Sequence, residues 1–449
     1  MGGYLAYPEY KESGVEWLGE IPAHWIATVI KFQYDIQLGK MLQPQPNSDE
    51  DEETSYLKAF HVQWKGVNLE DLPKMWASPK DLNKYFVENG DLLICEGGEV
   101  GRAALLQGLE EECIIQNSLH RVRGTKKACV EFLNYFMRHV ADSGWFDILC
   151  SKATIAHLTG EKLAIINFPL APIAEQRQIA AFLDYKTGQI DALIAKKEAL
   201  LEKLAEKRTA LISQAVTKGL DPTVPMQDSG IPWLGDIPAH WGVLKLCRRW
   251  TVIDCKHKTV EFIDEGFPVA SIGEVRNHKF DLSQAKYTSL ESYLDLIDGR
   301  KPQKNDLIYS RNATVGCVGF VDQDVDFCMG QDVCLIKTST ESNKFLWWQL
   351  QSNFLIDQLQ SIFVGATFKR INVADIKSYL VCCPPIEEQT SISEFLDKKT
   401  RLIDEQQVRI QEAIYRLKEY RTALITNAVT GKIDVRDIKL PTLTPAEAA

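Results

Sequence analysis

The segment SGVEWLGEIPAHW, Ser13–Trp25, returns with three changes as SGIPWLGDIPAHW at Ser229–Trp241, 216 positions later. A second segment, PIAEQRQIAAFLDYKTGQID at Pro172–Asp191, returns as PIEEQTSISEFLDKKTRLID at Pro385–Asp404, 213 positions later. This period is far longer than the ~20–50 residues of a solenoid repeat. The sequence therefore predicts the duplication of a whole unit, in which a module is followed by a helix.

The stretches between the repeated segments differ. DLLICEGGEVG at Asp91–Gly101 matches DLIYSRNATVG at Asp306–Gly316 only loosely. This pattern indicates a common scaffold that carries two modules with separate tasks. We divide the chain into a first module at 1–171, a first helical region at 172–226, a second module at 227–384, and a second helical region with a C-terminal tail at 385–449.

Two long helices are the clearest secondary structure. Apolar residues recur in both with alternating spacings of three and four, which is typical of a coiled-coil seam. The seam residues are Ile190, Ile194, Leu201, Leu204, Leu211, Ile403, Ile410, Ile414, Leu417 and Leu424. Lys197, Arg208, Gln407 and Arg421 interrupt the seam. If an internal two-fold axis relates the halves, the helices run antiparallel; the alternative is that each helix packs only on its own module.

Both modules are predicted to mix helix and strand. Short apolar runs predict strands, and longer periodic runs predict helices. The strands are expected at Asp91–Cys95, Ile114–Val122, Asp306–Ser310 and Val333–Lys337, and the helices at Phe132–Val140 and Phe345–Leu359. The expected fold class is α+β: two α/β modules separated by two long antiparallel coiled-coil helices, with a pseudo-two-fold internal repeat.

Composition excludes several classes of protein. Of the 449 residues 45% are hydrophobic and 25% are charged, which is the balance of a folded chain. No apolar run reaches the ~18–20 residues of a membrane span, and the N-terminal residues lack a signal pattern, so a cytoplasmic protein is expected. The eleven cysteines contain no C-x-x-C pair, which favours buried free thiols over a metal site.

The net charge of −10 is unusual for a protein that binds nucleic acid. Five of the acidic residues form one run at Asp49–Glu53, which reads as a solvated loop. A local basic face can coexist with such an acidic remainder. Composition therefore neither supports DNA binding nor excludes it.

Catalytic motifs are missing from the sequence. It contains no G-x-x-x-x-G-K-[ST], H-E-x-x-H or G-x-S-x-G pattern. Gly97–Gly101 lacks the spacing of a cofactor loop and predicts a tight turn. His24 and His240 occupy equivalent positions, where a packed structural turn is expected, and Glu387–Glu388 are expected to complement a helix dipole.

Polar residues at equivalent places in the modules are candidates for DNA contacts. Arg311–Thr314 follows a predicted strand and corresponds to Glu96–Glu99; Thr367–Asn372 corresponds to Thr154–Thr159. Arg and Lys neutralise phosphates, and Arg and Asn form paired hydrogen bonds with base edges. The candidate DNA-binding residues are Arg102, Lys152, Thr154, His157, Arg311, Asn312, Thr314, Lys369, Arg370 and Asn372. The alternative for any one of them is ordinary surface polarity.

The two GxxWLGxIPxHW leaders, the I-x-E-Q…FLD…ID segments and the RTALI…AVT endings resemble the specificity subunit of type I restriction–modification systems. The resemblance covers essentially the whole chain. It implies two target-recognition domains that each read one half of a split sequence in double-stranded DNA. It also implies that the conserved helices hold two modification subunits. Glu96–Glu99 departs from the basic pattern of Arg311-Asn312.

The same resemblance implies where the chemistry resides. The modification subunits would bring S-adenosylmethionine and the adenine methyltransferase site. Restriction subunits would bring cleavage and translocation driven by ATP and Mg. This chain itself would hold no cofactor, no metal and no catalytic residue. Two alternatives stay open: a methyltransferase–specificity fusion enzyme, and a coiled-coil scaffold that binds only proteins.

The paired helices are also expected to set the distance between the two half-sites. From about Gln189 to Thr217 a helix is roughly 43 Å long at ~1.5 Å per residue. Modules on one face of DNA need half-site centres about 10–10.5 base pairs apart. With half-sites of three to five base pairs, roughly six unread base pairs should separate them.

Overall fold

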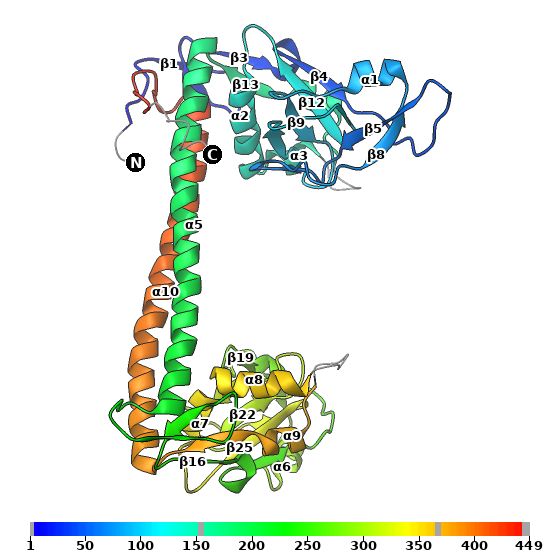
Figure 1. Ribbon diagram of the computed structural model, residues 1–449. Helices are drawn as coiled ribbons and strands as arrows, with labels where there is room; N and C mark the ends of the chain where they lie inside the picture. The colour runs from blue at the N-terminus through cyan, green and yellow to red at the C-terminus, as the bar shows by residue number, and fades with distance from the viewer. Residues whose placement is uncertain (1–3, 151–156, 364–369, 442–449) are drawn as a thin grey trace. The chain divides into compact units, whose positions relative to one another are not determined.

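The computed structural model describes residues 4–150, 157–363 and 370–441. The chain forms two compact units, each of which combines one module with parts of both long helices (Figure 1). Unit 1 comprises Met1–Lys197 and Glu412–Ala449, and unit 2 comprises Glu198–Gln411. Within the described residues, no helix has the length and apolar character needed to cross a membrane.

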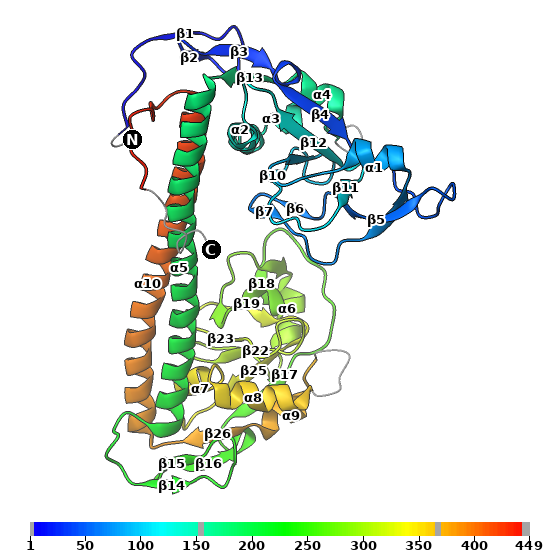
Figure 2. The same ribbon diagram turned by 45° about the horizontal axis from the view of Figure 1, so that its top comes forward.

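The modules share one sheet topology (Figure 2). Each has a four-stranded antiparallel sheet and a three-stranded sheet that contains one parallel pair. In unit 1 the orders are β10 (Ala103–Leu105), β9 (Leu92–Cys95), β12 (Leu119–Gly124), β4 (Tyr34–Leu38), and β11 (Cys113–Ile115), β5 (Glu52–Leu57), β8 (Lys74–Ala77). In unit 2 they are β23 (Val318–Phe320), β22 (Leu307–Ser310), β25 (Val333–Lys337), β17 (Thr251–Asp254), and β24 (Cys328–Met329), β18 (Phe267–Ala270), β21 (Lys286–Thr288).

Alternation along the inner strands builds the core of unit 2. All four residues of β22 are buried, because side chains cover both faces of this central strand. Leu307 and Tyr309 pack in one cluster with Val252, while Ile308 packs in another with Leu335. Successive side chains of a strand point to opposite faces, so one short strand joins two hydrophobic clusters.

The long helices α5 (Ile173–Lys218) and α10 (Ile386–Val429) pair within both units. Arg421 Nε lies 3.0 Å from Asp191 Oδ1 in unit 1, and Arg208 Nε lies 3.2 Å from Asp404 Oδ1 in unit 2. The later residue of one helix meets the earlier residue of the other, so the helices are antiparallel. All ten predicted seam residues are buried or half-buried. The predicted pair is confirmed, and two of the residues that interrupt the seam form its ion pairs.

The first turn of each long helix fastens the repeated leader to it. Glu175 accepts hydrogen bonds from Trp25 Nε1 at 3.0 Å and His24 Nε2 at 2.9 Å. In the second copy Glu388 accepts them from Trp241 Nε1 at 3.0 Å and from His240 Nε2 at 2.6 Å. The two leader histidines are therefore structural, as predicted.

The glutamine after each of these glutamates binds the module. Gln176 Oε1 accepts a bond from the backbone N–H of Cys129 at 3.0 Å, immediately before α2 (Val130–Asp142). Gln389 Oε1 accepts one from the N–H of Ser342 at 2.9 Å, before α7 (Asn343–Gln349). The E-Q pair in each repeat thus joins leader, module and helix at one point.

Two predicted elements were wrong in extent. Ile114–Val122 is not one strand, because a turn at Gln116, closed by a 2.9 Å bond from Leu119 N to Gln116 O, separates β11 from β12. Phe345–Leu359 is not one helix, because Ser352 ends α7 by donating to Gln349 O at 2.6 Å and begins α8 (Asn353–Ile362). Apolar runs concealed both breaks, since they continue across the polar residues that make the turns.

The remaining elements are short. The predicted tight turn at Gly97–Gly101 is confirmed, since Gly98 and Gly101 have φ of 75° and 76° between β9 and β10. The other helices are α1 (Pro79–Tyr85), α3 (Trp145–Leu149), α4 (Gly160–Ala164), α6 (Leu290–Ile297) and α9 (Val373–Ser378). The strands that follow the leaders are β3 (Ile26–Val29), paired with β13 (Asn167–Leu170), and β16 (Gly242–Lys245), paired with β26 (Leu380–Cys383). Two hairpins pair β6 (Val62–Gln63) with β7 (Gly66–Val67), and β19 (Val275–Arg276) with β20 (Lys279–Phe280).

Candidate nucleic-acid interface

In unit 2 the two predicted DNA-binding segments meet at one edge of the module. Asn312 and Arg370 form an isolated antiparallel bridge, and Ile371 N donates to Arg311 O at 3.0 Å. Lys369 lies outside the described residues. We call Asn312 and Arg370, together with the backbone bridge between them, the second edge. Residues that lie 58 positions apart in the sequence are thus neighbours here.

Unit 1 has the same arrangement at the equivalent residues. Leu158 N donates to Glu96 O at 2.7 Å, which matches the bond between Ile371 and Arg311. A Cβ added to Gly97 would lie 3.4 Å from His157 Nδ1, so these two residues are also adjacent. We call Gly97 and His157 the first edge. The predicted residues Lys152 and Thr154 lie outside the described residues.

Arg311 is held inside the module. Its side chain is 5% exposed, its Nε donates to Ile371 O at 3.1 Å, and its guanidinium forms an ion pair with Asp254. A side chain buried in this way does not face a groove of DNA in this conformation. Its contacts are with the carboxylate of Asp254 and with the backbone behind the second edge.

Arg370 and Asn312 lie further out and share an acidic partner. The side chain of Arg370 is 49% exposed, and its Nη2 lies 3.0 Å from Asp332 Oδ1. Asn312 Nδ2 donates to Asp332 Oδ2 at 3.2 Å. Asp332 therefore orients both polar side chains of the second edge, while leaving half of the Arg370 surface free for a ligand.

The other predicted residues have local contacts. Asn372 is the N-cap of α9, and Thr314 Oγ1 lies 2.9 Å from Ser310 Oγ. Arg102 forms an ion pair with Glu99 at 3.0 Å and donates to Ala59 O at 2.9 Å. None of these bonds points to a ligand, and the DNA-binding role of these residues stays a prediction.

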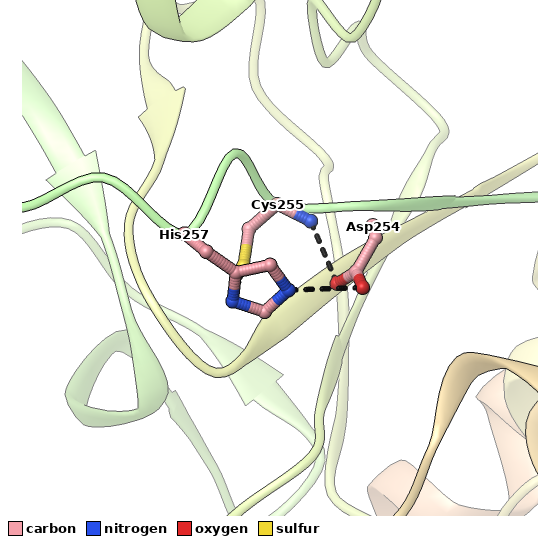
Figure 3. Close-up of side chains that lie close together, drawn as sticks. All are labelled: Asp254, Cys255 and His257. Atoms are coloured by element: carbon pink, nitrogen blue, oxygen red, sulfur yellow. Dashed lines mark hydrogen bonds and ion pairs between the residues drawn. The ribbon is translucent and has the colours of Figure 1, made fainter.

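Asp254, Cys255 and His257 offer ligand atoms within 4.8 Å of one another (Figure 3). Asp254 also forms the ion pair with Arg311. His257 Nε2 lies 3.0 Å from Asp254 Oδ2, and Cys255 Sγ lies 3.6 Å from His257 Nδ1. Burial alone would raise the pKa of Asp254, but the hydrogen bond from His257 and the charge of Arg311 hold it below its ordinary value. Asp254 also accepts a bond from the N–H of Cys255 at 2.9 Å. Its oxygens thus already accept bonds from protein donors, and the group is best described as a hydrogen-bond network around the ion pair of Asp254 with Arg311.

Sequence reasoning missed a buried histidine behind the first edge. His120 Nε2 lies 2.8 Å from Leu158 O, and because a carbonyl oxygen only accepts, Nε2 carries the proton. Its Nδ1 has no hydrogen-bond partner among the residues that the structure describes. Burial lowers the pKa of His120, which keeps the ring neutral. A single histidine within an apolar strand gives no sequence signal for such a role.

These features define a class of protein: one α/β module present twice, each copy with its own polar edge, on an antiparallel helix pair. Comparison with known sequences agrees. The family model described as the type I restriction modification DNA specificity domain matches residues 77–203 and 253–416. The chain belongs to this family.

Individual relatives point the same way. The type I restriction enzyme EcoKI specificity subunit of Escherichia coli K12 is 22% identical, covering 92% of this chain and 90% of the relative. The MjaVIII specificity subunit of Methanocaldococcus jannaschii is 23% identical, covering 80% and 83%.

Solved structures share the fold. A chain from a structure on complex assembly and conformational transition of the type I R-M system has a TM-score of 0.71 at 14% identity, over 92% of this chain and 99% of that one. The HsdS subunit from Thermoanaerobacter tengcongensis has a TM-score of 0.54 at 14% identity, over 92% and 98%.

Proposed function

We propose that this chain is the sequence-reading subunit of a type I restriction–modification enzyme and recognises a bipartite target in double-stranded DNA. The observation that carries the proposal is the repeated edge: Asn312 and Arg370 in unit 2 stand where Gly97 and His157 stand in unit 1. An identical scaffold with different side chains at this place is what two independent readers of sequence require.

The chain supplies specificity but not chemistry in this proposal. Two modification subunits provide methyl transfer from S-adenosylmethionine, and restriction subunits provide cleavage driven by ATP and Mg. The enzyme acts in the cytoplasm, where chromosomal DNA is accessible. The helix pair offers a surface for these partners, since Leu200 of α5 is 45% exposed and Val408 of α10 is 58% exposed. Apolar side chains in such positions support a protein partner.

Methylation mapping tests the proposal. Host DNA is sequenced for adenine methylation with and without this chain, and one split motif should appear or vanish. Purified alone, the chain should neither methylate nor cut DNA, and adding modification subunits should restore methylation. Robust methyl transfer by the isolated chain would favour a fusion enzyme instead. Absence of any sequence-dependent, salt-sensitive DNA binding would favour a protein-only scaffold.

Modular reading is tested by exchange. Replacing residues 26–171 with the corresponding module of a relative should change one half of the methylated motif and leave the other intact. A change in both halves would contradict independent reading.

The distance between the half-sites is tested by insertion. Four helical residues near Lys218 add up to ~6 Å, so the unread gap should grow by one or two base pairs. An active enzyme with an unchanged gap would contradict the role of the helices as a spacer.

A further inference from the structure

We infer that Arg311 and His120 are positioning residues that hold the two DNA-reading edges from inside the modules, and that the residues in contact with bases lie on the edges themselves. This inference rests on the proposed function. It assigns Arg311, which the sequence suggested as a DNA contact, to a different task.

The two side chains bind equivalent backbone oxygens. Arg311 Nε donates to Ile371 O at 3.1 Å, and His120 Nε2 donates to Leu158 O at 2.8 Å. Ile371 and Leu158 lie 213 positions apart, which is the displacement of this part of the repeat. The N–H of Ile371 also donates to the carbonyl oxygen of Arg311, and that of Leu158 to the carbonyl oxygen of Glu96. Arg311 and Glu96 are the residues directly before the second and the first edge. The same backbone strand is thus fixed through both its N–H and its carbonyl in each module.

His120 lies in β12, whereas Arg311 directly follows β22, and the residues around the two donors differ accordingly. His120 in β12 is paired in register with Leu38, whereas the equivalent pair in unit 2 is Cys334 with Asp254. Cys334 is too short to take the place of His120, and Arg311, the residue after β22, reaches the carbonyl instead. Asp254 replaces Leu38 where the arginine needs a carboxylate, because a buried unpaired guanidinium would be costly.

The second edge depends directly on this anchor. Arg311 N donates to Asp332 O at 2.9 Å, and the carboxylate of Asp332 holds both Arg370 and Asn312. A shift of Arg311 would therefore move the side chains of Asn312 and Arg370 together. Discrimination between bases needs side chains placed to a fraction of an ångström, so the anchor acts on specificity through them.

The experiment uses the full complex of this chain with its modification subunits and maps methylation at the intact motif and at all single-base variants of it. The variants are Arg311→Lys, Asp254→Asn, Arg370→Ala, Asn312→Ala and His120→Gln. Arg276→Lys, an exposed arginine of the same unit, is the matched control. Arg311→Lys keeps the positive charge but lacks the Nε donor.

We expect Arg311→Lys to lower discrimination roughly ten-fold at the base positions that Arg370→Ala or Asn312→Ala also relaxes, with the other half-site unchanged. Asp254→Asn should give the same pattern, and it serves as the test if Arg311→Lys does not fold, as judged by thermal unfolding. His120→Gln should relax only the other half. Arg276→Lys should match the wild type.

Two results would overturn the inference. If Arg311→Lys altered a base position that neither edge variant alters, Arg311 itself would contact that base. If methylation fell equally at cognate and variant sites, the residue would have only a structural role. Failure of the proposed function is distinguishable, because the wild-type complex would then show no motif that depends on this chain.

Discussion

The two modules sit on their helices in different ways, although the helices carry the same motif. In unit 2, Trp348 of α7 is buried in one hydrophobic cluster with Ile212 of α5 and Leu396 of α10. Trp347 packs against this cluster, and its Nε1 donates to His278 O at 3.1 Å. The equivalent residues of α2 in unit 1 are Asn134 and Tyr135, which line a cleft of about 600 Å³.

Polar contacts replace aromatic packing in unit 1. Tyr135 donates to Asp184 Oδ1 at 2.7 Å, and burial raises the pKa of both groups. In unit 2 the matching Asp397 instead pairs with Lys344 at 3.3 Å, and the Lys344 ammonium lies 4.4 Å from the centre of the Trp347 ring. The same scaffold thus tolerates either a tightly packed interface or a cleft between the module and the long helices. The residues that differ between the two copies decide which of the two forms.

The largest expected effect is the removal of one aromatic anchor. Trp348→Ala should destabilise unit 2 by about 3–5 kcal/mol, because the side chain is fully buried. Tyr135→Ala, at the cleft, should lower the stability of unit 1 by about 1–2 kcal/mol. Hydrogen exchange in β22 and β9 reports the two units separately. Equal losses of stability for the two variants would show that the cleft does not weaken the packing of the first module on the long helices.

Removing the leader's glutamate should also affect the units unequally. The side chain of Glu175 is 6% exposed and also accepts a bond from Tyr7 Oη at 2.6 Å, whereas that of Glu388 is 40% exposed. We expect Glu175→Ala to cost about 3 kcal/mol and Glu388→Ala about 1 kcal/mol, measured by denaturant unfolding. Glu387→Ala, in the same first turn, is the control. A larger loss of unfolding free energy for Glu388→Ala than for Glu175→Ala would contradict this prediction.

Low pH should destabilise unit 2 through the hairpin of β19 and β20, which carries a histidine where the hairpin of β6 and β7 in unit 1 does not. Burial, and then the charge of Arg208, lower the pKa of His278 to about 4, whereas Lys65 occupies this place in unit 1. The folded state therefore keeps His278 neutral while the unfolded chain binds a proton below its pKa of ~6.5. Stability contributed by this group is complete above pH 6.5 and is lost as the pH falls toward 4.

From pH 7 to pH 5 the loss attributable to His278 should be about 1–2 kcal/mol in unit 2. His278→Gln should remove that part of the pH dependence in β22 and leave unit 1 unchanged. His120 and His139, whose pKa values are also lowered by burial, should preserve the acid sensitivity of unit 1. An unaltered pH profile of His278→Gln in unit 2 would contradict this assignment.

The smallest expected effect is a gain in the stability of unit 1. Asn134 Oδ1 is buried without a hydrogen-bond partner among the described residues. Asn134→Trp copies Trp347 into the cleft and should stabilise unit 1 by about 1 kcal/mol through added apolar burial. Asn134→Leu is a control for apolar character without size. Destabilisation by the tryptophan, seen as faster exchange in β9, would show that the cleft is not shaped like its filled counterpart.

Much of the fold could be predicted, for reasons visible in particular residues. The seam residues Ile190 and Ile414 follow a spacing that only a helix pair satisfies, and the structure buries both. Strand β25 at Val333–Lys337 has the predicted bounds, since its apolar run is bounded by polar residues. The breaks at Gln116 and Ser352 were missed because local hydrogen bonds, and not hydrophobic pattern, create them.

The candidate site was predicted only in outline. Equivalence between repeats singled out the segments of Asn312 and Arg370, but it did not predict that the two segments are neighbours. It could not distinguish Arg370, half exposed, from Arg311, which is buried. That difference depends on Asp254, which reaches Arg311 only when β17, β25 and β22 form one sheet.

The sequence by itself therefore determined the duplication, the helix pair and the family, because repeats and periodicity are properties of the order of residues along the chain. Only the tertiary structure decided which side chains face outward. Burial and hydrogen bonding arise between residues such as His120 and Leu158 that lie far apart in the sequence. No local pattern specifies such partners, since they are chosen by how the strands pack.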